Sequence, residues 1–130
     1  YPLVSIHPQA KLAAEYGVCV AKLGGNHALF LFANEEFNGQ QGLATADGAQ
    51  LTLKSAVSKV GLDPAKVETC AADPATAAEV DKSVNLARDL NINQTPMLLI
   101  NGRQVPVAGM AYETLKNIIE YQEKLDGIQQ

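Results

Sequence analysis

The chain contains two cysteines, Cys19 and Cys70, which are its only candidate sulfur nucleophiles. A redox-catalytic pair needs a low-pKa thiolate at a helix N-terminus, with its resolving partner one turn away. Cys19 instead falls in the middle of a predicted helix, on an apolar stripe where the pKa of a thiol rises. The two residues are therefore excluded as a catalytic pair. Two inert buried thiols and a structural disulfide both remain open.

The two histidines, His7 and His27, are the other residues that could join a metal site with the cysteines. Their spacing matches no zinc pattern, because the chain has neither Cys-x-x-Cys nor His-x-x-x-His, and a cysteine inside a helix is a poor ligand. Both histidines are interpreted as polar residues near helix starts. We expect no metal and no cofactor.

A β-hairpin is predicted after Thr95-Pro96. The apolar run Met97–Ile100 is separated from the run Arg103–Val107 by Asn101-Gly102. Asn-Gly between two such runs is the strongest short-range hairpin signal, because a type I′ turn needs positive φ at both central residues. The two-residue turn fixes the register and pairs Met97 with Pro106.

The two strands of this hairpin have different surroundings. Pro106 lacks an N–H, so Arg103–Val107 is predicted to be a sheet edge. Met97–Ile100 is apolar on both faces, which is typical of a strand covered by helices above and below and flanked by a second strand. The sequence offers no convincing candidate for that second strand. We therefore expect the chain to self-associate through an open apolar edge.

The other elements are predicted to be helices. Aspartate followed by proline marks a helix start, glycine marks a helix end, and apolar residues at 3.6-residue spacing mark the buried stripe. The predicted elements are a helix from Pro8 stopped by Gly24-Gly25, a helix over Asn26–Phe37, a loop over 38–50, a helix from Thr52 to Val60, a short helix opened by Asp63-Pro64, a longer one from Asp73-Pro74 to about Leu90, and a closing helix over Tyr112–Leu125.

The bulk properties exclude several function classes. A length of 130 residues fits one domain, or a domain with an inserted subdomain. The net charge of −4 argues against a nucleic-acid surface, and no apolar run approaches the ~18 residues of a membrane span. Glu35-Glu36 and the acidic face of the last helix are interpreted as solvated surface. The apolar stretch Tyr1–Ile6 runs directly into a helix, so we expect the chain to be a fragment of a longer protein.

The stretch LNINQTPMLLINGRQVPVAGMAYETLKNIIE resembles the C-terminal part of DsbA-like thiol–disulfide oxidoreductases. In that family a helix leads to a loop with a cis-proline, then to a hairpin and a final helix. HPQAKLAAEYGVCVAKLGG and GLDPAKVETCAADP look like the helical subdomain inserted into the same fold. The resemblance implies an α/β, thioredoxin-like fold, here incomplete: a helical insertion subdomain over 1–92, with the remnant of a strand at 1–6, and a ββα part over 93–130.

The family's Cys-x-x-Cys is absent, and the resemblance places it N-terminal to Tyr1, so no catalytic residue is expected in this chain. On the residues alone, Pro96 is an ordinary trans proline; the resemblance instead implies a cis bond, with the backbone of Thr95 pairing with an extended substrate. The substrate-binding residues would be Gln94, Thr95 and Pro96. Cys19 and Cys70 would form a structural disulfide, which favours the periplasm or another extracytoplasmic compartment.

The function implied by the resemblance is thiol–disulfide exchange on protein substrates with cysteines, together with a redox partner protein. The intact protein would perform it, while this chain supplies the docking loop and the helical lid. Two alternatives remain. One is a redox-inactive thioredoxin-like module that binds a partner. The other is a glutathione-using enzyme of the kappa type, whose serine would also lie before Tyr1.

Overall fold

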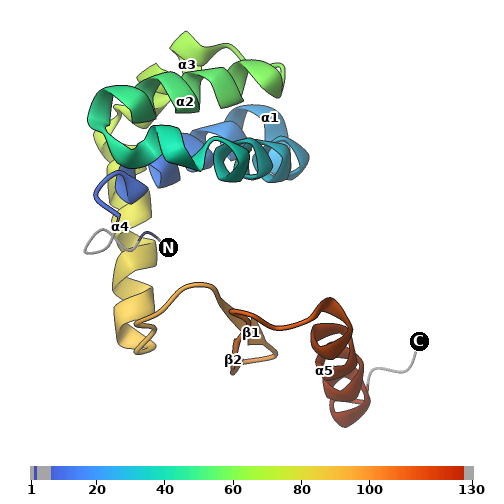
Figure 1. Cartoon of the computed structure of the whole chain (residues 1–130). Helices are drawn as coiled ribbons and strands as arrows, with labels where there is room; N and C mark the ends of the chain where they lie inside the picture. The colour runs from blue at the N-terminus through green and yellow to red at the C-terminus, as the bar shows by residue number, and fades with distance from the viewer. Residues whose placement is uncertain (1, 3–6, 128–130) are drawn as a thin grey trace. The chain divides into compact units, whose positions relative to one another are not determined.

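The structure is a computed structural model, which describes residues 2 and 7–127. Apart from Pro2, the strand remnant expected at 1–6 lies outside the described residues. The chain divides into two compact units, Tyr1–Leu90 and Asn91–Gln130 (Figure 1). The elements of the first unit are α1 (Ala10–Asn38), the 3₁₀ helix η1 (Gln40–Ala44), α2 (Ala46–Lys59), α3 (Pro64–Ala71) and α4 (Pro74–Asp89). Those of the second are β1 (Met97–Ile100), β2 (Arg103–Pro106) and α5 (Tyr112–Leu125).

The helix α1 is two helices joined by a sharp break at Gly25. Gly25 has φ 78° and ψ 178°, a conformation that only glycine adopts readily. The predicted division into one helix before Gly24-Gly25 and another after it is therefore correct. The break changes the direction of the helix at Gly25. Ala28 and Phe32 in the second half are buried in the same core as Cys19 in the first half.

Gly25→Ala is expected to lower the free energy of unfolding by about 1–3 kcal/mol, because alanine is strained in this backbone conformation. A Cβ on Gly25 would meet nothing within 4 Å, so the loss comes from the backbone alone. Urea denaturation followed by circular dichroism measures it. Gly17→Ala is the matched control, since its Cβ would make only an ordinary 3.5 Å contact with Leu29. An equal loss in both variants would contradict the explanation.

The core of the first unit lies where α1 packs against α2, α3 and α4. Fully burying an aliphatic or aromatic side chain stabilises a fold by about 1.5–3 kcal/mol, so a handful of such residues dominates the stability of this unit. The largest fully buried side chains are Tyr16, Phe32, Leu53, Val20, Val57, Val67, Thr76 and Cys19.

The starts of α3 and α4 follow the predicted signals. Asp63 accepts a hydrogen bond from the backbone N–H of Ala65 at 2.9 Å, and Asp73 accepts one from Ala75 at 2.8 Å. In each helix a proline occupies the first turn, where its missing N–H costs nothing. These two helices are thus specified by local sequence.

The predicted loop over 38–50 is wrong, because this segment forms η1 and the first turn of α2. The cap of α2 is Thr45, whose hydroxyl accepts from the N–H of Gly48 at 3.1 Å, and not Thr52. A Cβ on Gly42 would lie 2.1 Å from Thr52 Oγ1. Glycine is needed there for the close approach of η1 to α2, so its presence does not indicate a flexible loop.

The second unit contains the predicted hairpin in the predicted register. β1 and β2 pair antiparallel, with Met97 opposite Pro106 and Ile100 opposite Arg103. Asn101 has φ 47° and Gly102 has φ 80°, as a type I′ turn requires. The described residues of the second unit do not provide the expected helical cover on both faces of β1, where Leu98 is 38% exposed and Leu99 45%. Within the described residues, β1 has only β2 as a strand neighbour.

The closing helix α5 has the bounds that its apolar periodicity predicts, Tyr112–Leu125. Its inner stripe of Leu115, Ile118 and Ile119 is half-buried. Among residues 2 and 7–127, no helix combines the length and hydropathy that crossing a bilayer requires.

Candidate functional site

The loop between α4 and β1 carries the three predicted docking residues. Gln94, Thr95 and Pro96 are all exposed and follow one another in a bend directly before Met97. The Thr95–Pro96 peptide bond is cis. The backbone leaves α4 through Asn91, which has φ 55°. Gln94, Thr95 and Pro96 therefore form one short exposed surface, which we call the docking loop.

Neither cysteine of the chain is available as a free thiol. Cys19 and Cys70 are joined in a disulfide, and the chain has no other cysteine. The prediction of a structural disulfide is confirmed, and the alternative of two inert thiols is wrong. Nucleophilic thiol chemistry is therefore not available from residues 1–130 while this bond is intact.

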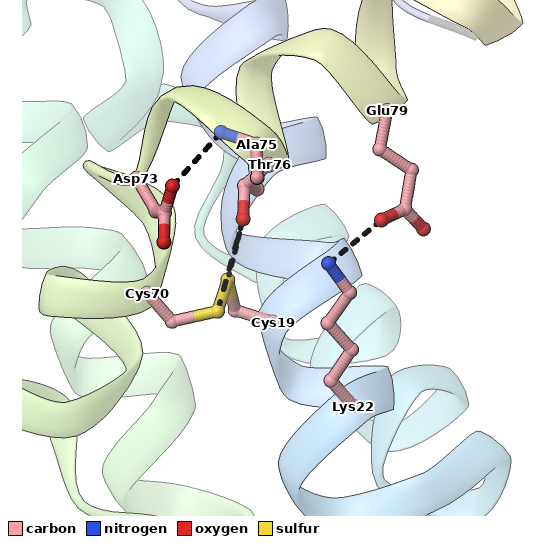
Figure 2. Close-up of polar contacts among 7 residues, drawn as sticks. All are labelled: Cys19, Lys22, Cys70, Asp73, Ala75, Thr76 and Glu79. Carbon is pink, nitrogen blue, oxygen red and sulfur yellow. Dashed lines mark hydrogen bonds and ion pairs between the residues drawn. A yellow bond between two sulfur atoms is a disulfide. The ribbon is translucent and has the colours of Figure 1, made fainter.

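The disulfide joins α1 to α3 in the core of the first unit (Figure 2). The Cα atoms of Cys19 and Cys70 are 5.9 Å apart, and Cys19 is fully buried. The hydroxyl of Thr76, near the start of α4, lies 3.7 Å from Sγ of Cys19 and 3.9 Å from Sγ of Cys70. The disulfide and the Thr76 hydroxyl thus bring α1, α3 and α4 together in the core, as expected of a bond with a structural role.

A cavity lies beside this core. It is bounded by the first half of α1, by the second half of α1 and by α4. Its volume is about 530 Å³. Small residues on the first half of α1 form much of its wall, and polar groups are few. The lining residues are Pro2, Ala13, Ala14, Gly17, Val18, Ala21, Lys22, Leu29, Glu36, Glu79, Val80 and Ser83.

Glu36 is the unusual residue of this cavity. Its Oε1 is buried and has no hydrogen-bond partner among the described residues. Burial raises the pKa of this carboxyl from 4.5 to about 7. The interpretation of Glu35-Glu36 as solvated surface is therefore wrong for Glu36. Glu35 differs, because it pairs with Lys59 at 2.6 Å.

A signal for the burial of Glu36 is present in the sequence. Glu36 follows Leu29 and Phe32 at spacings of seven and four residues, so it continues the apolar stripe of its helix. The sequence interpretation missed it because adjacent glutamates are more often solvent-exposed. The break at Gly25 turns this stripe toward the first half of α1.

The second unit has its own polar cluster, centred on Asp126 at the end of α5. Gln122 Nε2 donates to Asp126 Oδ2 at 2.7 Å, and Asn101 Nδ2 in the hairpin turn donates to the same oxygen. Arg103 Nη1 lies 3.9 Å from Oδ1. The hydrogen bonds from Gln122 and Asn101, with the Arg103 charge, lower the pKa of Asp126. The cluster ties the hairpin to α5 and has no evident catalytic role.

His7 and His27 are both exposed, whereas Cys19 is fully buried. Across residues 2 and 7–127, no group of three or more histidine, cysteine or acidic side chains is placed to hold a metal ion.

The comparisons with known proteins identify the family. A thioredoxin family model matches residues 4–121, which are 118 of the 130 residues. No curated protein and no solved structure matches the chain significantly. The family match spans both units, including the disulfide and the docking loop. The chain therefore belongs to the thioredoxin family, and its fold is a mostly helical thioredoxin-like one with a two-stranded antiparallel sheet.

Proposed function

We propose that the intact protein catalyses thiol–disulfide exchange on extracytoplasmic protein clients, in the manner of DsbA-like oxidoreductases. The observation that carries the proposal is that a member of the thioredoxin family presents Gln94, Thr95 and Pro96 together at the start of β1. In such a loop the backbone of Thr95 would pair with an extended client segment by strand addition. The partners would be proteins with cysteines and a redox partner protein.

In this proposal residues 1–130 supply the docking loop and the helical subdomain but not the nucleophile. Cys19 and Cys70 are bonded to each other, so the reactive dithiol would be a Cys-x-x-Cys located before Tyr1. The buried disulfide also supports an oxidising compartment such as the periplasm, because disulfides are rare in the cytosol.

The chain alone is expected to show no turnover in a disulfide-reduction or disulfide-formation assay with a cysteine-containing peptide. A longer protein, expressed with the residues encoded upstream of Tyr1, is expected to be active if they contain Cys-x-x-Cys. In that active protein, Thr95→Arg is expected to lower kcat/KM for the peptide about tenfold, since a bulky charge obstructs strand addition. Asn117→Arg, on the exposed side of α5, is the matched control.

A second candidate function is a redox-inactive module that binds a protein partner through the same loop, which the lack of any free thiol favours. The upstream residues separate the candidates. A Cys-x-x-Cys supports the oxidoreductase, a lone serine supports a glutathione-using enzyme of the kappa type, and neither supports the binding module. Activity that Thr95→Arg leaves unchanged would contradict the role of the docking loop.

A further inference from the structure

The cavity between the two halves of α1 and α4 has the size of a small-molecule site. Ligand pockets typically have volumes of about 300–1,000 Å³, with mostly apolar walls and a few polar groups that orient the ligand. This cavity, at about 530 Å³, is walled by Ala14, Gly17, Val18, Leu29 and similar residues. Small side chains along α1 leave room for an aliphatic group.

Among the described residues, Oε1 of Glu36 is a buried carboxylate oxygen of this cavity lining without a hydrogen-bond partner. A buried acceptor without a hydrogen bond is costly, and the cost is larger when the acceptor is charged. The other charged residues of the lining are Lys22 and Glu79, which are paired with each other at 2.7 Å (Figure 2). The Lys22 ammonium group is therefore paired with Glu79, and no ion pair of Glu36 is found within residues 2 and 7–127.

We propose that this cavity binds a small aliphatic primary amine, with the ammonium group donating hydrogen bonds to the Glu36 carboxylate and the alkyl chain lying against the apolar wall. An ammonium group supplies three donors and a compensating positive charge. The carboxylate torsion of a glutamate is broad, so rotation can present either oxygen to the ligand. This proposal does not depend on the redox function.

The charge on Glu36 favours a cation over other ligands of the same shape. A neutral alcohol could donate one hydrogen bond but would leave the charge uncompensated, and a carboxylate ligand would be repelled by Glu36. Because the pKa of Glu36 is about 7, the ionised form dominates above neutral pH, where an alkylammonium is still protonated. The site should therefore be most selective for the amine near pH 8.5.

The test is calorimetric titration of the 130-residue chain with hexylammonium chloride at pH 8.5, beside hexanol and hexanoate. Hexylammonium is expected to bind saturably, at least about tenfold more tightly than hexanol, with no binding of hexanoate. Glu36→Gln is expected to remove at least about tenfold of the amine affinity. Glu35→Gln, which makes the same charge change next to it, is expected to leave the affinity unchanged.

A measurement on the unmodified chain keeps the test independent of how the variants fold. Saturating hexylammonium is expected to lower the pKa of Glu36, followed by carbon NMR of its carboxyl group. Saturating hexanol should lower this pKa less, because it supplies one hydrogen bond and no charge. The proposal is overturned if hexylammonium shows no saturable binding, if hexanol binds equally well, or if the Glu36 pKa does not move.

Discussion

Replacing Cys19 and Cys70 together by alanine is expected to lower the free energy of unfolding of the first unit by about 4 kcal/mol. The bond joins residues 51 apart in the sequence, so it closes a long loop and removes much of the conformational freedom of the unfolded chain. A loss of this size is a large part of the stability of a small unit, whose total is about 5–15 kcal/mol.

Urea denaturation followed by circular dichroism at 222 nm measures this loss, because the first unit contains most of the helix. Reduction of the unmodified chain with a phosphine is expected to lower its midpoint to that of the double variant. The same reductant should leave the double variant unchanged. Thr76→Val is a control that removes the hydroxyl near the two sulfurs but keeps the covalent bond.

The loss of unfolding free energy in the double variant should come from the missing Cys19–Cys70 bond. If the double variant unfolds within about 1 kcal/mol of the unmodified chain, loop closure is not what stabilises this unit. A loss in Thr76→Val as large as that in the double variant would instead assign the effect to packing around Thr76.

Glu36→Gln is expected to stabilise the chain by about 3 kcal/mol at pH 8.5 and to change its stability little at pH 4.5. The pKa of Glu36 is about 7 in the folded chain against an ordinary value of 4.5. A tenfold change in proton affinity corresponds to about 1.4 kcal/mol. Burial of the ionised Glu36 side chain therefore lowers the free energy of unfolding. Glutamine carries no charge, so its burial has no such cost.

The sign of the pH dependence follows from linkage. The folded state binds the Glu36 proton more tightly than the unfolded state does, so this residue is harmless below about pH 4.5. Stability is lost as pH rises from about 4.5 to 7, and the penalty is constant above that range. Urea denaturation of Glu36→Gln and of the unmodified chain across pH 4.5–8.5 should give curves that diverge in this interval.

Glu35→Gln is the matched control for Glu36→Gln. Glu35 makes an ion pair with Lys59 at the surface, and exposed pairs are worth about 0–1 kcal/mol. Its removal should give a small loss with no divergence between pH 4.5 and 7. A Glu36→Gln variant that is less stable at pH 8.5 than the unmodified chain would contradict the burial of an uncompensated charge.

Much of the fold could be predicted because its signals are local. Asp63-Pro64 and Asp73-Pro74 act within one helical turn, and Asn101-Gly102 fixes the hairpin through the φ angles of two residues. Gly25 breaks α1 for the same kind of reason. In each case the residue itself has the conformation or the capping oxygen that the structure uses.

The sequence-based prediction is wrong where the environment of a glycine or a charged residue is set by residues that are distant in the sequence. Gly42 is required by the closeness of Thr52, so a glycine-rich stretch was misinterpreted as a loop. The stripe of Leu29 and Phe32 indicates that Glu36 is buried, but no local pattern predicts that the other half of α1 and α4 line the same cavity.

The candidate site divides in the same way. The loop before Met97 could be predicted from its place before an apolar run, because a loop is defined by its own residues. The role of Gln94, Thr95 and Pro96 in substrate binding is implied only by the family resemblance and stays a prediction. The pairing of Cys19 with Cys70 could not be derived from spacing, and the family resemblance had to supply it. The cavity around Glu36 was invisible in the sequence, because its walls come from three helical segments.

The sequence by itself determined the starts of α3 and α4, the break in α1, the hairpin register and the bounds of α5, since capping, turn and periodicity signals act over one to two turns of chain. Only the tertiary structure decided which side chains are buried together: the disulfide with Thr76, and the unpaired carboxylate in its cavity. The physical reason is that solvation depends on all surrounding segments, whereas backbone conformation depends mainly on neighbours in the chain.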